Sequence, residues 1–231
     1  MHPILYIVVF LLCGCRVHRG YSYPGPTSHM GREPLSYLQR VADQLPSSSE
    51  EEPSTPERET PKGELVVASA VSLLGQKKLM VGGQSYRYDC SGFVMAAYAG
   101  AEIVLSGSSR GLYELSEKEG WLHKKKIPKK GDVAFFDNSF DRNKNGRRDD
   151  ELTHVALVES VDEDGTITMI HLGGQGIVRT VMNLKHPELR QSEDGKVLNS
   201  WLRVATKRDK GPRLTGQLWK AFASMWQKDS D

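Results

Sequence analysis

Two apolar runs joined by a tight acidic turn constrain the fold of this chain more than any other feature. Residues 154–161 (HVALVESV) and 166–172 (TITMIHL) are rich in the β-branched and apolar side chains that favour strands. The turn between them, Asp162 to Gly165, ends in an Asp-Gly pair, which is typical of β-hairpins. The sequence therefore predicts an antiparallel hairpin at the centre of the folded region.

Other segments surround this hairpin and define the fold class. Residues 64–74 and 90–99 are apolar on most faces and are interpreted as buried helices. Further strands are expected at residues 132–136, 177–182 and 201–205, and a C-terminal helix at residues 214–226. Helices followed by an antiparallel sheet predict an α+β domain.

The N-terminus has the pattern of an export signal. Residues 4–12 (ILYIVVFLL) form an apolar run that is too short for a bilayer-spanning helix, which needs about 20 residues. Its length fits the apolar region of a secretion signal, typically about 7–15 residues. The following Leu12-Cys13-Gly14-Cys15 resembles the lipobox of bacterial lipoproteins, with Cys15 as the lipid-attachment site. An uncleaved apolar N-terminus or a misassigned start codon is the alternative.

Composition divides the chain into four regions. Hydrophobic residues are 38% of the chain, which is low enough that part of it should lie outside a core. We expect a signal peptide at residues 1–14, a disordered Ser/Pro/Glu-rich tether at 15–62, a folded domain at 63–210 and a helical tail at 211–231. The net charge of +2 gives no reason to expect a nucleic-acid partner.

Cys90 is the candidate nucleophile. Cleavage before Cys15 would leave Cys90 as the single free thiol of the mature protein, so a disulfide framework is excluded. In the motif Tyr88-Asp89-Cys90-Ser91-Gly92, the cysteine begins a buried helix, where unpaired N–H groups favour the thiolate and can stabilise an oxyanion. A capped helix with a packed, unreactive thiol is the alternative interpretation of this motif alone.

Two of the seven histidines interrupt apolar strands and are candidate catalytic groups. The hairpin pairs residues whose numbers sum to about 327, which places His154 and His171 nearly opposite each other at its open end. Side by side, they could act as a base and the group that orients it. Two satisfied core histidines, or a zinc site shared with Cys90, are the alternatives.

These motifs together resemble the NlpC/P60 cysteine peptidases of bacterial cell walls. The matching segments, in family order, are YDCSGFV around Cys90, KKGDVAFFD at 129–137, HVALV from His154 and MIHLGG around His171. The resemblance implies a papain-like α+β core, with Cys90 on a helix packed against the antiparallel sheet. It implies that Cys90 attacks an amide, His154 transfers the proton and His171 orients His154. It also implies that the stem peptide of peptidoglycan is the substrate, cut between D-glutamate and the diamino acid.

The resemblance extends to substrate-binding positions, with one departure. Asp89 and Ser91 match positions that contact the stem peptide in the family. Leu79 stands where many members carry a tyrosine that helps to bind substrate or the oxyanion, and Tyr86 or Tyr88 could replace it. We take Asp89, Ser91 and Tyr88 as the candidate substrate-binding residues.

The loop at residues 141–152 (DRNKNGRRDDEL) resembles the start of a calcium-binding loop. Asp141, Asn143, Asn145 and Asp149 fall at the first, third, fifth and ninth places, with glycine at the sixth. The twelfth place holds Leu152 instead of the usual glutamate, so the match is incomplete. We expect no cofactor to be required for catalysis, and a structural calcium ion or a simple polar turn are the two interpretations of this loop.

The sequence thus predicts a cysteine endopeptidase with a Cys-His-His triad that acts on peptidoglycan. An amidase or acyltransferase with the same Cys-His pair and a non-catalytic wall-binding lipoprotein are the alternatives. We expect a monomer, bound to the membrane through its N-terminal lipid and located on the outer membrane, facing the periplasm. The outer-membrane assignment rests on the lipobox and on Arg16 following Cys15.

Overall fold

The computed structural model describes residues 61–204 and 209–228. The predicted signal peptide, the lipid-attachment residue Cys15 and the predicted tether up to residue 60 lie outside the described residues. Within the described ranges, no helix has the length and apolar character needed to cross a membrane.

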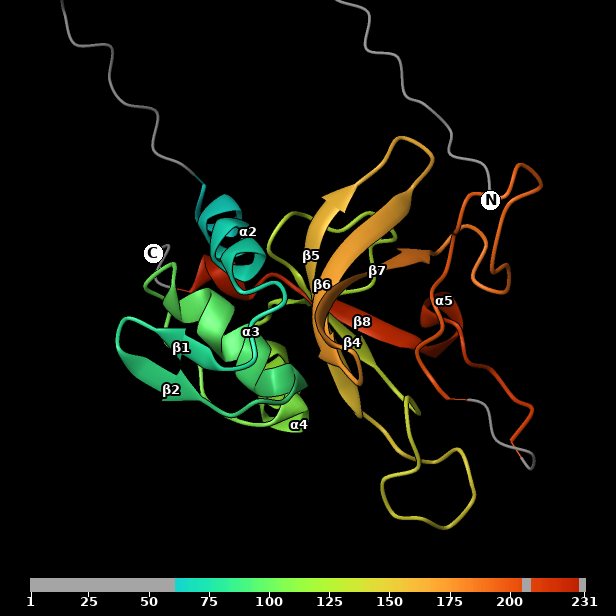
Figure 1. Cartoon of the computed structure of the whole chain (residues 1–231), viewed down its shortest axis with the longest axis horizontal. Helices are drawn as coiled ribbons and strands as arrows, with labels where there is room; N and C mark the ends of the chain where they lie inside the picture. The colour runs from blue at the N-terminus through green and yellow to red at the C-terminus, as the bar shows by residue number, and fades with distance from the viewer. Residues whose placement is uncertain (1–60, 205–208, 229–231) are drawn as a thin grey trace, which may run out of the picture. The chain divides into compact units, whose positions relative to one another are not determined.

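In the part of the chain that the structure describes, three helices come before the main sheet (Figure 1). Helix α2 (Lys62–Ser72) and helix α3 (Cys90–Ala99) agree with the predicted helices at 64–74 and 90–99, and α3 begins at the predicted residue. Helix α4 (Ser109–Lys118) was not predicted, although the Ser108 hydroxyl caps it by accepting from the Gly111 N–H. Between α2 and α3, a Gly82-Gly83 turn connects the short strands β1 (Leu79–Val81) and β2 (Gln84–Tyr86).

The main sheet has six antiparallel strands in the order β3-β8-β4-β5-β6-β7. Their bounds are β3 Leu122–His123, β4 Val133–Phe136, β5 His154–Val161, β6 Thr166–Gly173, β7 Gly176–Asn183 and β8 Trp219–Ala223. The predicted hairpin is β5 and β6, and Leu157 pairs with Ile170 in the predicted register. Because α2 and α3 pack against this sheet, the predicted α+β fold is confirmed.

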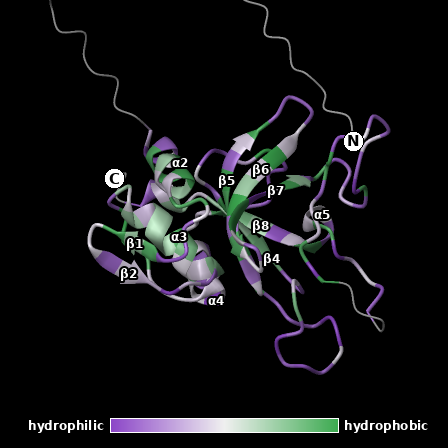
Figure 2. Cartoon of the chain, viewed as in Figure 1, coloured by the Kyte–Doolittle hydropathy of each residue, from purple (hydrophilic) through white to green (hydrophobic). Residues whose placement is uncertain are grey.

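The central strands are buried on both faces of the sheet. In β4, Val133 and Phe135 pack with the helices, whereas Ala134 and Phe136 pack in a second apolar cluster on the opposite face. Figure 2 shows that hydrophobic residues gather in these central strands and in α3, whereas the β4–β5 loop is hydrophilic. Because β4 is buried on both faces, its sequence is continuously apolar and does not alternate between apolar and polar residues.

The C-terminal region differs from the prediction. Residues 214–226 form a short helix α5 (Thr215–Leu218), then strand β8, then the 3₁₀ turn η1 (Met225–Gln227), so the predicted single helix is wrong. Strand β8 fills the edge of β4 and places Phe222 and Ala223 in the apolar clusters on opposite faces of the sheet. Strand pairing and burial outweigh the helical spacing of these apolar residues. The predicted boundary at residue 210 therefore cuts through the domain.

Over its described part, residues 201–204, the predicted strand at 201–205 is also not formed. Residues 201–204 belong to a loop whose one strand-like contact is an isolated bridge between Trp201 and Leu214. This loop lies beside the β4–β5 loop and contributes to the cleft described below.

Candidate active site

Cys90 is the first residue of α3, and the residues around it hold the start of that helix. Asp89 is the N-cap: one of its carboxylate oxygens accepts from the Gly92 N–H (2.7 Å) and from the Ser91 hydroxyl (2.8 Å). A Cβ placed on Gly92 would lie 1.9 Å from the Arg87 carbonyl oxygen. Glycine is therefore required here by the chain's own backbone rather than by the approach of a substrate.

The electrostatic environment of Cys90 corrects one prediction. Burial raises the pKa of the Cys90 thiol, and the charge of Asp89 raises it further. The backbone N–H groups of Val155, Ser91 and Cys90 act in the opposite direction, but burial outweighs them. The resting residue is thus a neutral thiol rather than the expected thiolate, and it needs a base to remove its proton during attack.

The two predicted histidines meet across the β5–β6 hairpin. His154 Nε2 and His171 Nδ1 are 2.8 Å apart, and the two rings are perpendicular. Burial, and then the neighbouring His171, lower the pKa of His154 to about 3, and burial lowers the pKa of His171 to about 4. Both imidazoles are therefore neutral near pH 7, as a general base must be before it accepts a proton.

The contact between the rings determines which nitrogen of His154 is available as a base. If the Nε2–H of His154 donates to Nδ1 of His171, Nδ1 of His154 carries the free lone pair. The backbone N–H of Val155, the residue that follows His154, lowers the pKa of the Cys90 thiol, which places the sulfur near the start of β5. This arrangement can transfer the thiol proton to His154 while His171 fixes the orientation of the ring.

One cleft contains all three of these residues. The thiol and both histidines line it together with Tyr88 and Asp89. Ser91 is buried and is not among the described residues that line the cleft, so the structure places it beneath the site. Leu79 is also buried, in the core.

Tyr88 is the tyrosine that reaches the cleft. The Tyr88 hydroxyl donates its one proton to the Gln76 carbonyl oxygen at 2.8 Å, so this proton is not available to a ligand. Tyr88 can therefore accept from a substrate N–H, whereas the backbone N–H groups at the start of α3 remain the better donors to an oxyanion.

Sequence reasoning missed the outer wall of the cleft. Phe140, Trp201, Leu202 and Val204 line it from the β4–β5 loop and the 199–214 loop. Neither loop carries a family motif, and Trp201 was assigned to a strand. A large aromatic side chain in a polar, Asn- and Ser-containing segment was the available signal of an exposed role.

The candidate calcium loop forms a tight polar turn. Asp141 accepts from the N–H groups of Asn145 and Gly146, and the Asn143 and Asn145 side-chain amides donate to Asp149. Among the described residues, no group of three or more His, Cys, Asp or Glu side chains is placed to hold a metal ion. The four predicted ligands do lie close together, and calcium binding by this set stays a prediction.

The described residues form an α+β domain whose cleft holds a thiol at a helix N-terminus beside two strand histidines. Residues 81–172, which hold all three candidate catalytic residues, match the family model of the CHAP domain. This match agrees with the predicted resemblance to cell-wall cysteine peptidases over the segment that holds Cys90, His154 and His171.

Among solved structures, the chain is similar to a protein described as similar to lipoprotein, NLP/P60 family, from Staphylococcus aureus subsp. aureus Mu50. The two are 20% identical, with a TM-score of 0.37, over 71% of this chain and 49% of that one. The similar region thus spans about half the length of the staphylococcal chain. No curated protein sequence matches the chain significantly.

Proposed function

We propose that the protein is a cysteine endopeptidase that hydrolyses the stem peptides of peptidoglycan. The observation that carries the proposal is the placement of Cys90, His154 and His171 on one cleft, with the two histidines 2.8 Å apart. The CHAP-domain match, which supports peptidoglycan as the substrate, spans the same three residues.

The proposed reaction begins from a neutral thiol and a neutral imidazole. His154 takes the thiol proton as the sulfur attacks the amide carbon, and the N–H groups at the start of α3 stabilise the negative charge on the carbonyl oxygen. The protonated His154 then gives its proton to the leaving amine, which leaves a thioester on Cys90. Water, deprotonated by His154, hydrolyses the thioester and restores the thiol.

The environment of the pair favours concerted proton transfer over a stable ion pair. Burial raises the pKa of Cys90 and lowers that of His154 to about 3, so both shifts disfavour a resting thiolate–imidazolium pair. His171 is neutral as well and offers the imidazolium a lone pair without adding a charge.

The bond between D-glutamate and the diamino acid is the proposed point of cleavage, and digestion of purified peptidoglycan by the full-length protein tests it. Mass spectrometry of the products separates the alternatives. Fragments that end in D-glutamate support the endopeptidase. Intact stem peptides released from the glycan would identify an amidase instead, and no fragments from a folded, reduced protein would favour a binding role.

We further propose that Cys15 carries a lipid and that residues 15–62 tether a monomeric catalytic domain to the outer membrane, on its periplasmic side. Metabolic labelling with a radioactive fatty acid tests this. Label in the wild type that is lost in Cys15→Ala would support the anchor, and equal label in both would contradict it.

A further inference from the structure

Exposed apolar side chains are concentrated at the candidate cleft. Of the ten large hydrophobic side chains that are exposed among the described residues, four line it: Tyr88, Phe140, Trp201 and Val204. Phe140 is 50% exposed and Trp201 is 54% exposed. Exposed apolar surface that is gathered in one place is typical of a binding site. These side chains therefore indicate that the ligand has an apolar part.

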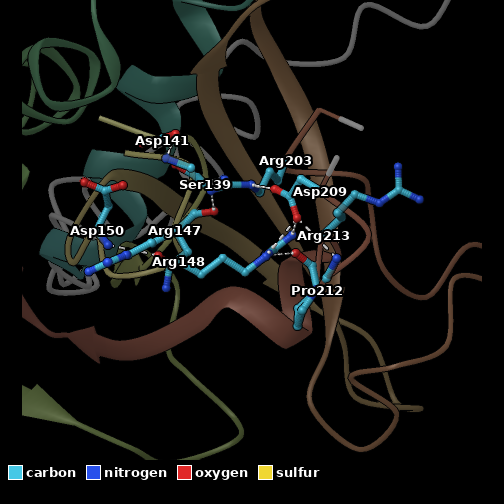
Figure 3. Close-up of polar contacts among 12 residues, drawn as sticks. Ser139, Asp141, Arg147, Arg148, Asp150, Arg203, Asp209, Pro212 and Arg213 are labelled. Atoms are coloured by element: carbon cyan, nitrogen blue, oxygen red, sulfur yellow. Dashed lines mark hydrogen bonds and ion pairs between the residues drawn. The ribbon is translucent and has the colours of Figure 1, made fainter. Parts of the chain in front are cut away.

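The wall that carries Trp201 is held in place by a network of contacts. Trp201 forms a β-bridge with Leu214, and the Arg213 guanidinium lies 4.4 Å from the centre of its ring. Close by, Asp209 binds both Arg203 and Arg148, which joins the 199–214 loop to the β4–β5 loop (Figure 3).

Arg203 reinforces this connection. Its side chain is 7% exposed, and it donates to the Asn138 carbonyl oxygen at 2.7 Å. A buried arginine with satisfied hydrogen bonds fixes the loop that presents Trp201, so the aromatic surface is in position before a ligand arrives.

The chemistry of the proposed substrate determines what this surface can bind. Stem peptides are built from alanine, glutamate, a diamino acid and alanine, none of which has a large apolar side chain. The sugar rings of the glycan strand do present apolar C–H faces, surrounded by hydroxyl and acetamido groups. Trp201 and Phe140 match such a face, and the exposed amide of Gln175 on the same cleft can hydrogen-bond the polar groups.

We propose that Trp201 and Phe140 form a subsite for a sugar ring of the glycan strand, so that the enzyme acts on stem peptides still attached to glycan. This inference rests on the proposed peptidoglycan hydrolase function. It adds a substrate class, the sugar-linked peptide, and two residues that determine specificity.

A binding measurement tests the subsite independently of catalysis. The full-length Cys90→Ala chain is titrated calorimetrically with the disaccharide N-acetylglucosaminyl-N-acetylmuramic acid. We expect binding that weakens roughly tenfold when Trp201→Ala is added, the scale of one lost aromatic contact. Leu189→Ala is the matched control, because Leu189 is 49% exposed but does not line the cleft. Absence of binding, or equal weakening in both variants, would overturn the proposal.

A kinetic comparison tests the consequence for specificity. The ratio of kcat/KM for a disaccharide-linked stem peptide to kcat/KM for the same peptide without sugar is measured in the wild type and in Trp201→Ala. The proposal predicts a ratio above one that falls roughly tenfold in the variant. A ratio that does not change on substitution contradicts it. If the wild type cleaves neither substrate, the proposed function fails, and the disaccharide titration still decides the subsite.

Discussion

His154 Nε2 lies 2.8 Å from His171 Nδ1, and this single contact joins two residues that are 17 positions apart in the sequence. It pairs a buried imidazole with a neutral partner rather than with a carboxylate. The partner can fix a tautomer but adds no charge, so orientation is its main contribution.

Substitution of His171 tests that orientation role. His171→Asn keeps an acceptor near His154 Nε2, whereas His171→Leu removes it. We expect kcat on peptidoglycan fragments to fall about 10- to 100-fold in His171→Leu and less in His171→Asn, because loss of an orienting partner costs about this much in other sites. Equal activity in His171→Leu and the wild type would contradict the role.

The burial of both histidines predicts acid sensitivity of the fold. Their pKa values of about 3 and 4 lie below the ordinary value of 6.5, so between these limits the unfolded chain binds more protons than the folded one. Stability should therefore be constant above about pH 7 and decrease as the pH falls from 6.5 towards 4. Urea unfolding at several pH values measures this.

The control for acid sensitivity is the double variant His154→Gln/His171→Asn, which removes both groups. Its stability should depend less steeply on pH between 7 and 4.5. The same slope in the variant and the wild type would show that other groups cause the acid sensitivity.

Two glycine substitutions compare the tight backbone packing beside Cys90 with an open position in α4. Gly92→Ala places a methyl group 1.9 Å from the Arg87 carbonyl oxygen and should destabilise the domain by about 3 kcal/mol or more. Gly111→Ala, in α4, meets no atom within 4 Å and should stabilise it by roughly 0.5–1 kcal/mol. Chemical denaturation of both variants measures the difference. A stable Gly92→Ala variant would contradict the described geometry.

Calcium binding at the 141–149 loop predicts a melting temperature that rises with added calcium. Asp149→Asn should reduce the rise, because it removes one charge while retaining a side-chain oxygen. Differential scanning calorimetry with calcium, and with magnesium as the control, measures it. A melting temperature independent of calcium would leave the loop as a polar turn.

The sequence predicted the parts of the site that depend on local patterns. The Asp-Gly turn located the β5–β6 hairpin, across which His154 and His171 meet. The cap at Asp89 fixed the start of α3 at Cys90. In both cases a short-range rule, turn geometry or helix capping, determines the result.

The parts that were missed depend on contacts distant in the sequence. Strand β8 forms because β4 needs a partner, although its own spacing is helical. Trp201 reaches the cleft through ion pairs of Asp209 with two arginines that no local pattern shows. The thiol was expected to be ionised because a helix N-terminus is visible in sequence, whereas the depth of burial is not.

Peptide release by Cys90 variants tests the central claim most directly. Wild-type protein, Cys90→Ala and Cys90→Ser are incubated with purified peptidoglycan, and the new amino groups are counted over time. Circular dichroism first shows that each variant is folded. The account predicts release by the wild type and none above background by Cys90→Ala. Release by Cys90→Ala at the wild-type rate would contradict Cys90 as the nucleophile.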